Sequence, residues 1–197
     1  MRLGGIGRAI GDLLAARGAL VCYVDIFEPT DIEVLQSSPR RRFALCDVTS
    51  EEEVDKAFTR VEHEWGTVSI LVNNAGVLYL ATLEDTDRGT WERTFAVNTT
   101  GAFLCAKRAL PGMARQGYGR VITIGSSAGK TGGVSRVGAY AASKAAVMAL
   151  AKTIASEYAA AGVTSNALAP ALIETDMIAG SLDQFVDRIP VGRLGTP

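Results

Sequence analysis

The sequence is poor in the residues from which most metal and hydrolase sites are built. It has one histidine, His63, within the acidic run VEHEWG, and three cysteines, Cys22, Cys46 and Cys105. A single histidine excludes a multi-histidine metal site and would have to serve any Ser-His-Asp hydrolase alone, so we expect His63 on the surface of a helix. The cysteines are widely spaced in apolar sequence, which is typical of buried free thiols in a reducing cytoplasm.

An excess of charge and a long apolar span are also missing. The net charge is −1, and the one basic cluster, Arg40-Arg41-Arg42, follows Ser-Ser-Pro, which is typical of a solvated turn. A phosphate or nucleic-acid contact is the less favoured interpretation of this cluster. The most apolar long stretch, residues 139–162, carries Lys144, Lys152 and Glu157. We therefore expect no nucleic-acid partner, no membrane partner and no secretory signal.

Short β-branched runs alternate with helical patterns along the whole chain, which predicts βαβ units and a parallel sheet covered by helices. The fold class we expect is α/β, a doubly wound parallel sheet in a single domain over residues 1–197. Ser50 with Glu53 is a capping-box signal, and Gly162 is suited to the C′ position after a helix. The expected strands are 19–25, 42–48, 69–76, 120–126 and 163–170; the expected helices are 5–17, 50–65, 87–115 and 139–161.

Polar residues or turn formers stand at the end of every expected strand. In an open parallel sheet, ligands bind beyond the carboxyl ends of the strands, so these positions predict a ligand site at one rim. They are Asp25, Asp47, residues 73–76, residues 125–126 and Pro170.

The N-terminal stretch GGIGRAI resembles part of a phosphate-binding glycine loop. Gly5, Ile6 and Gly7 lie where a helix begins, so backbone N–H groups and the positive helix end can face a phosphate. Asp25 closes the next strand, where a carboxylate accepts hydrogen bonds from adenosine ribose hydroxyls. An acid at this position repels a 2′-phosphate, which favours NAD(H) and leaves NADP(H) open.

The stretch AYAASKAAV places Tyr140 and Lys144 four residues apart, on one face of a helix. A phenol with a pKa near about 10 exchanges protons poorly at neutral pH. A nearby ammonium lowers that pKa, as general acid–base catalysis requires. Ser126 ends a strand that points to the same rim, so we expect the three side chains to meet.

These elements together resemble the classical short-chain dehydrogenase/reductase family over nearly the whole chain. The matching motifs occur in the family's order, and the pieces VITIGS, NALAP and IETDM resemble 3-oxoacyl-[acyl-carrier-protein] reductases. The motifs are GGIG, CDV at 46–48, NNAG at 73–76, VN at 97–98, IGSSAG at 124–129, YAASK at 140–144 and PALIETDM at 170–177.

The resemblance implies a role for each catalytic candidate. Tyr140 exchanges a proton with the substrate oxygen, and Lys144 lowers the pKa of Tyr140 and binds the nicotinamide ribose. Ser126 holds the substrate oxygen, and Asn98 anchors a water chain that relays the proton. Ser127 is the alternative serine. Ser126 is preferred because Gly129 follows it in the family's S-x-x-G spacing.

The resemblance also implies the cofactor contacts and one departure from the family pattern. Ala171 stands where the family usually has glycine after the proline, which tightens the space beside the nicotinamide. Asp47 and Val48 would flank adenine, Asn74, Ala75 and Gly76 the adenosine side, and Pro170, Ile173 and Thr175 the nicotinamide carboxamide, in addition to Gly5, Ile6, Gly7, Asp25, Tyr140 and Lys144.

Both ends of the chain depart from the family pattern. The family loop reads T-G-x-x-x-G-x-G, and its first glycine would fall at residue 1, so we expect the first, central strand to be missing and its two neighbours to lack a partner. The last helix and strand would follow residue 197. A truncated sequence, an ordered fragment of a longer protein and a short form that no longer binds cofactor all remain open.

We therefore predict an oxidoreductase that transfers a hydride between NAD(P)(H) and a small carbonyl compound or secondary alcohol. Residues 177–197 are the expected substrate lid, and the resemblance implies a homo-oligomeric complete protein, a dimer or tetramer. The alternative is an inactive relative that acts as a binding protein. The four intact residues Asn98, Ser126, Tyr140 and Lys144 argue against it.

Overall fold

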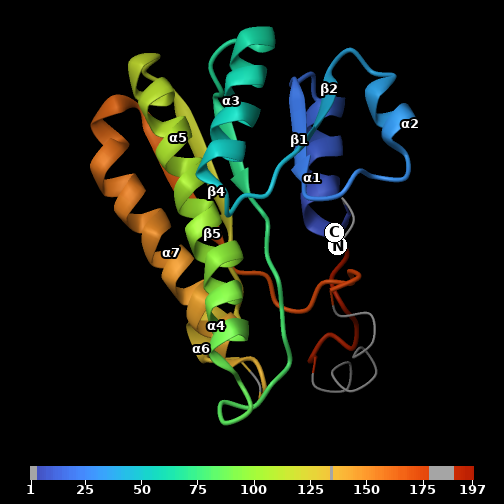
Figure 1. Cartoon of the computed structure of the whole chain (residues 1–197), viewed down its shortest axis with the longest axis vertical. Helices are drawn as coiled ribbons and strands as arrows, with labels where there is room; N and C mark the ends of the chain where they lie inside the picture. The colour runs from blue at the N-terminus through green and yellow to red at the C-terminus, as the bar shows by residue number, and fades with distance from the viewer. Residues whose placement is uncertain (1–3, 134, 178–188) are drawn as a thin grey trace. The chain divides into compact units, whose positions relative to one another are not determined.

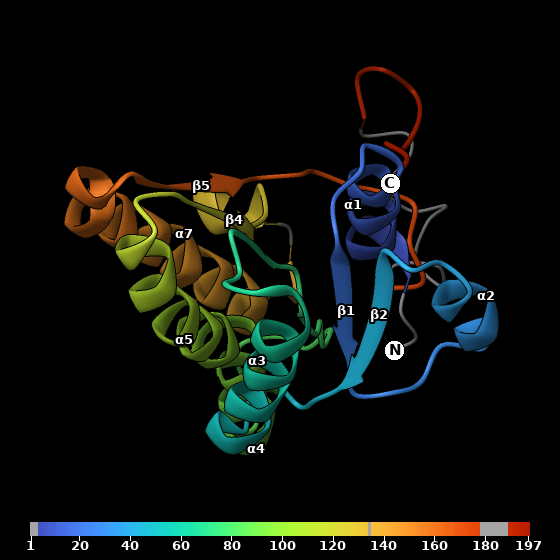
Figure 2. The same cartoon turned by 90° about the horizontal axis from the view of Figure 1, so that it is seen from above.

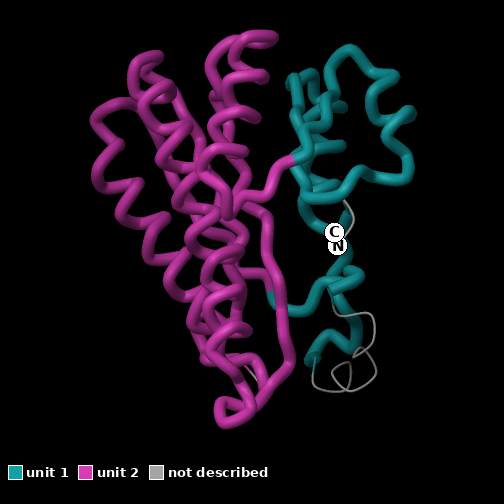
Figure 3. Tube along the Cα trace, in the orientation of Figure 1, with its two compact units in different colours: residues 1–45, 171–197 teal, residues 46–170 magenta. Residues whose placement is uncertain are grey.

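The computed structural model describes residues 4–133, 135–177 and 189–197 (Figure 1). The chain divides into two compact units, one made of residues 1–45 with 171–197 and the other of residues 46–170 (Figure 3). The expectation of a single domain stays a prediction. Most of the expected lid, residues 178–188, lies outside the described residues.

The first unit holds a two-stranded parallel sheet with its helices. Val21 lies opposite Arg41 and Asp25 opposite Leu45. A small core forms around the buried side chains of Tyr23, Leu35 and Phe43. The elements are α1 (Gly5–Ala16), β1 (Val21–Asp25), α2 (Ile32–Gln36) and β2 (Arg41–Leu45).

The second unit holds a three-stranded parallel sheet in the order β3-β4-β5. Its strands are β3 (Ile70–Asn73), β4 (Gly119–Ile124) and β5 (Val163–Leu168). Its helices are α3 (Glu51–Trp65), α4 (Arg88–Phe95), the π-helical turn η1 (Ala96–Thr100), α5 (Gly101–Arg115), α6 (Ala128–Thr131), α7 (Gly138–Tyr158) and the 3₁₀ turn η2 (Ala159–Ala161).

Helices α5 and α7 cover one face of the three-stranded sheet (Figures 1 and 2). Apolar side chains of the two helices pack against β4 and β5, and Met113, Val121 and Val163 are almost completely buried there. Gly119 allows this close packing, because a Cβ at that position would lie 2.7 Å from the Met113 side chain. The fold is Rossmann-like, with parallel strands flanked by helices, as the sequence predicts.

Several helix boundaries agree with the sequence signals. The Ser50 hydroxyl accepts a hydrogen bond from the Glu53 N–H and caps α3. Gly162 has a φ of 77° after η2, the left-handed conformation that glycine adopts readily. The helix expected over 87–115 is present, but the π-helical turn at 96–100 divides it into α4 and α5. The short helices α2 and α6 were not expected, since four or five residues carry too little periodicity.

The strands lie in two separate sheets. Among the described strands, β1 pairs only with β2, and β3 pairs only with β4. These are the two strands that the family pattern predicted to lack a neighbour, and this expectation is confirmed. Val24 on β1 and Ile70 on β3 are correspondingly exposed.

Ser165 on β5 carries an unsatisfied polar group. Its residue is buried, and its hydroxyl makes no hydrogen bond within the part of the chain that the structure describes. The desolvation of an unpartnered hydroxyl costs free energy on folding.

We expect Ser165→Ala to raise the free energy of unfolding by about 1 kcal/mol, because it removes the unpaired hydroxyl with little change in volume. Urea denaturation measures the change. Thr94→Val is the control, since the equally buried Thr94 hydroxyl donates to the Thr90 carbonyl at 2.7 Å and its removal should not stabilise the fold. A less stable Ser165→Ala would contradict this prediction.

Candidate active site

Tyr140 and Lys144 lie on one face of α7, as their spacing predicts. Lys144 is only 4% exposed, and its Nζ donates a hydrogen bond to the Ile124 carbonyl oxygen at 2.7 Å, at the carboxyl end of β4. The same Nζ lies 5.8 Å from the centroid of the Tyr140 ring. The ammonium group is therefore held between the end of the sheet and the phenol.

Burial dominates the electrostatics of this pair. It lowers the pKa of Lys144 to about 8, because the ammonium form loses hydration. Burial raises the pKa of Tyr140, and a hydrogen bond from Ser126 opposes that rise. The net direction for Tyr140 is thus opposite to the lowering that the sequence led us to expect from Lys144, since desolvation of the phenolate is the larger effect.

Ser126, rather than Ser127, accompanies Tyr140. The Ser126 side chain is buried, hydrogen-bonds the Tyr140 phenol and accepts the Ala128 N–H at 3.2 Å. Ser127 instead begins α6: its N–H donates to the Pro170 carbonyl at 2.9 Å, and its carbonyl accepts from the Lys130 N–H. The catalytic role of Ser126 stays a prediction, and of the two serines it is the one whose side chain reaches Tyr140.

Gly129 explains the S-x-x-G spacing. A Cβ at Gly129 would lie 2.8 Å from the Lys144 carbonyl carbon and from the Ala145 nitrogen. Only glycine allows α6 to approach the backbone of α7 this closely. The segment that carries Ser126 is consequently packed directly against the turn that carries Lys144.

Asn98 lies in the π-helical turn and is 1% exposed. Its Oδ1 accepts the Val77 N–H at 2.7 Å, and its Nδ2 donates to the Val77 carbonyl at 3.0 Å and to the Ser143 hydroxyl at 2.9 Å. Both amide hydrogens are therefore used inside the protein. The role predicted for Asn98 as a water anchor stays a prediction, and its side-chain N–H groups are committed to other partners.

The remaining predicted residues of the second unit lie in loops that follow strands. Asp47 accepts hydrogen bonds from the Thr49 N–H and hydroxyl. Burial alone would raise the pKa of Asp47, but the two Thr49 bonds and the nearby Arg93 charge together lower it. Val48 packs against Gly101, where a Cβ would lie 2.6 Å from the Val48 side chain. Asn74, Ala75 and Gly76 follow β3, and Pro170 follows β5.

Gly76 lies beside two of the catalytic candidates. A Cβ at this position would lie 3.3 Å from both Asn98 Oδ1 and Lys144 Nζ. The two polar groups therefore border the same small space, which a larger residue at position 76 would fill.

The other predicted cofactor residues belong to the first unit. Gly5 begins α1 with a φ of 53°, and Ile6 and Gly7 follow it in the first turn. A Cβ at Gly5 would lie 3.0 Å from Thr175 Cγ2, so the structure brings Thr175 to the glycine turn. Ile173 forms an isolated bridge with Gly195.

Asp25 ends β1, as predicted. Its Oδ1 accepts the Phe27 N–H at 3.2 Å. Burial raises the pKa of this carboxyl, and backbone N–H bonds partly offset the rise.

Two residues near the predicted site were missed at the sequence level. Ser143 binds Asn98, and the only sequence signal was its place inside YAASK. Arg8 follows the glycine turn, and its guanidinium donates to Asp12 at 2.8 Å and to both Asp31 oxygens at 2.9 and 3.3 Å. Asp12 lies four residues after Arg8, a spacing that allows a pair on one helix face, whereas Asp31 is 23 residues away and no spacing rule identifies it.

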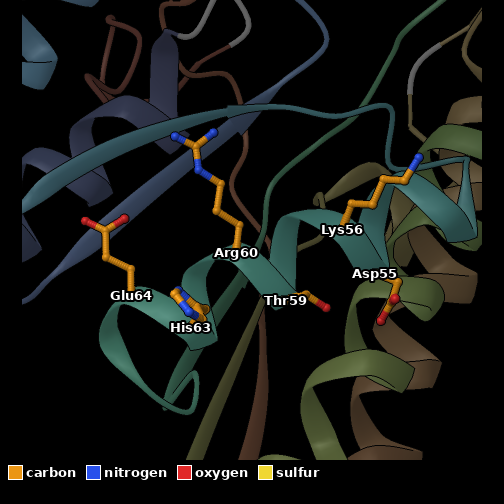
Figure 4. Close-up of a pocket in the computed structure, with 6 residues that line it drawn as sticks. All are labelled: Asp55, Lys56, Thr59, Arg60, His63 and Glu64. Atoms are coloured by element: carbon orange, nitrogen blue, oxygen red, sulfur yellow. The ribbon is translucent and has the colours of Figure 1, made fainter.

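A broad hollow along α3 contains none of the predicted site residues (Figure 4). His63 lies there and is exposed, as expected. Charged side chains dominate its lining, which consists of Asp55, Lys56, Thr59, Arg60, His63 and Glu64.

Within the described part of the chain, no helix combines the length and apolar character needed to cross a membrane.

Comparison with known proteins identifies the family. The model of the short chain dehydrogenase family matches residues 3–184. The 3-oxoacyl-[acyl-carrier-protein] reductase MabA of Mycobacterium tuberculosis is 40% identical over 98% of this chain and 76% of its own length. The NAD-dependent glycerol dehydrogenase of Listeria innocua is 33% identical over 98% of this chain and 78% of its own.

A solved structure agrees with this assignment. The gluconate 5-dehydrogenase of Burkholderia cenocepacia, in complex with NADP and tartrate, superposes with a TM-score of 0.89. It is 30% identical and covers 98% of this chain and 79% of the other. The site geometry, the family match and these relatives lead to one conclusion: the chain belongs to the short-chain dehydrogenase family and is an oxidoreductase.

Proposed function

We propose that Tyr140, Lys144 and Ser126 perform the proton transfer of a nicotinamide-dependent carbonyl reduction or alcohol oxidation. The observation that carries the proposal is the buried Lys144 ammonium beside a Tyr140 phenol that is hydrogen-bonded to Ser126. When bound, the nicotinamide supplies or accepts the hydride. The protein's task is then to hold the substrate oxygen and to move one proton.

In the direction of reduction, the carbonyl carbon gains the hydride and the carbonyl oxygen gains the Tyr140 proton, which gives an alcohol. Ser126 donates a hydrogen bond to the same oxygen as negative charge develops on it. Lys144 opposes the charge of the remaining phenolate, which then recovers a proton from solvent. Oxidation of the alcohol follows these steps in reverse.

The substrate class that best fits is a 3-oxoacyl thioester or a similar secondary alcohol or ketone. Support comes from the mycobacterial relative, named as a 3-oxoacyl-[acyl-carrier-protein] reductase, and from dehydrogenases of other alcohols among the relatives. A catalytically inactive binding protein is not favoured, because Tyr140 is hydrogen-bonded to Ser126 and lies beside Lys144, and the named relatives are enzymes. A homo-oligomer and a cytoplasmic location stay predictions from the sequence.

Replacement of Tyr140 by Phe tests the proposed proton donor. We expect kcat for NADH-dependent reduction of acetoacetyl-coenzyme A to fall by about 10²–10⁴-fold, because the variant has no proton to donate. The dissociation constant for NADH, from fluorescence titration, should change less than about twofold, since the ring remains. Tyr158→Phe, on the same helix, is the matched control. A Tyr140→Phe variant with the parent kcat would refute the assigned role.

We infer further that the chain prefers NAD(H) to NADP(H). Asp25 places a carboxylate at the end of β1, which opposes a 2′-phosphate. Four described basic side chains of the same unit, Arg8 and residues 40–42, already have partners. Arg8 is held by Asp12 and Asp31. Arg40 donates to the Gly18 carbonyl, Arg41 pairs with Asp12, and Arg42 donates to the Arg41 carbonyl.

The relatives include both cofactor classes, one named as NAD-dependent and one solved with NADP, so the preference needs its own test. We expect the parent to bind NADH more tightly than NADPH in fluorescence titrations, and Asp25→Asn to improve relative NADPH binding by about tenfold, through loss of one like-charge repulsion. Glu28→Gln removes the same charge from an exposed position nearby and should leave the ratio unchanged. Tighter NADPH binding by the parent, or an unchanged ratio in Asp25→Asn, would contradict the inference.

A further inference from the structure

Ser143 joins two of the catalytic candidates through two hydrogen bonds of its hydroxyl and makes a third bond through its carbonyl. Its hydroxyl accepts Asn98 Nδ2–H at 2.9 Å and donates to the Tyr140 carbonyl oxygen at 2.7 Å. Its own carbonyl accepts the Thr99 hydroxyl at 3.1 Å. The residue is 0% exposed. Two consecutive residues of the π-helical turn are thereby fixed to one residue of α7.

The Asn98 carboxamide depends on this hydroxyl. Val77 occupies Oδ1 and one amide hydrogen, and Ser143 is the partner of the other hydrogen. The side chain is buried, so an alanine at position 143 would leave an N–H without a partner. A buried unsatisfied donor costs about 1–3 kcal/mol, which is enough to turn or shift the amide.

A shift of this amide would change the space beside the catalytic lysine. Asn98 Oδ1 and Lys144 Nζ border the same small space beside Gly76, where a Cβ would lie 3.3 Å from each. Ser143 is also the residue immediately before Lys144, and its hydroxyl binds the Tyr140 backbone. The Asn98 amide and the Tyr140 backbone are therefore joined through the residue that precedes Lys144.

We propose that Ser143 is a positioning residue for proton transfer, which holds the Asn98 amide and the Tyr140–Lys144 turn of α7 in register. The inference rests on the proposed function of Tyr140 and Lys144. It assigns to Ser143 a role that acts through Asn98 and involves no contact with the substrate.

The Ser143→Ala variant tests this role. We expect kcat for NADH-dependent reduction to fall by about 10–100-fold, because small misplacements of reacting groups have effects of this size. KM for NADH should stay within about twofold. A merely structural serine would lower the unfolding temperature but leave kcat unchanged below it. Ser156→Ala removes an exposed hydroxyl from the same helix and is the matched control.

A second measurement needs no turnover. Val77 N–H donates to Asn98 Oδ1, so loss of the Ser143 anchor should speed hydrogen–deuterium exchange in the segment that contains Val77. Exchange at the distant α3 should be unaffected. If Ser143→Ala does not fold, Ser143→Cys keeps the size with a weaker acceptor and serves in the same comparison.

The outcomes separate the two levels of the proposal. An active parent, an inactive Tyr140→Phe and a Ser143→Ala variant with kcat within twofold of the parent would overturn the role of Ser143 alone. A parent that turns over no substrate would overturn the proposed function and with it the role of Ser143 in proton transfer. Faster exchange of Val77 would then support only the anchoring of Asn98 by Ser143, and unchanged exchange would refute that as well.

Discussion

The buried ammonium of Lys144 is the constraint on which the rest of the site depends. A charged amine loses hydration when it is buried, and the hydrogen bond of Lys144 to the Ile124 carbonyl compensates only part of that loss. The group must therefore be held by tightly packed neighbours. Lys56, Lys107, Lys130 and Lys152 are all exposed, which sets Lys144 apart from the other lysines of the chain.

The second unit is built around this requirement. Gly129 lets α6 pack against the Lys144 backbone, and Gly76 leaves room beside its Nζ. The π-helical turn brings Asn98 to both Val77 and Ser143, so the loop after β3 and helix α7 are connected through one side chain. Ser126, from the end of β4, then reaches the phenol that faces the ammonium. Close packing at the two glycines and the hydrogen bonds of Asn98 and Ser126 thus all act on the Tyr140–Lys144 pair.

The sequence predicts most of this arrangement, because the signals are local. Four-residue spacing on a helix puts Tyr140 and Lys144 on one face, and strand ends predict where Ser126 and Asp25 lie. The π-helical turn, the Asn98–Ser143 bond and the Arg8–Asp31 pair depend on contacts between residues far apart in the sequence, which no periodicity reveals. The direction of the Tyr140 pKa was wrong for a related reason: spacing shows which charges are near, whereas burial, which dominates here, appears only in the folded chain.

The most direct test of this account is an NMR titration of the lysine side chains in the folded protein, with the Lys144 signal assigned by its loss in Lys144→Arg. Burial disfavours the charged form, so the account predicts a Lys144 midpoint near pH 8, below the ordinary lysine pKa of 10.5. A Lys144 midpoint near 10.5 would show a hydrated ammonium and contradict the buried proton-transfer site.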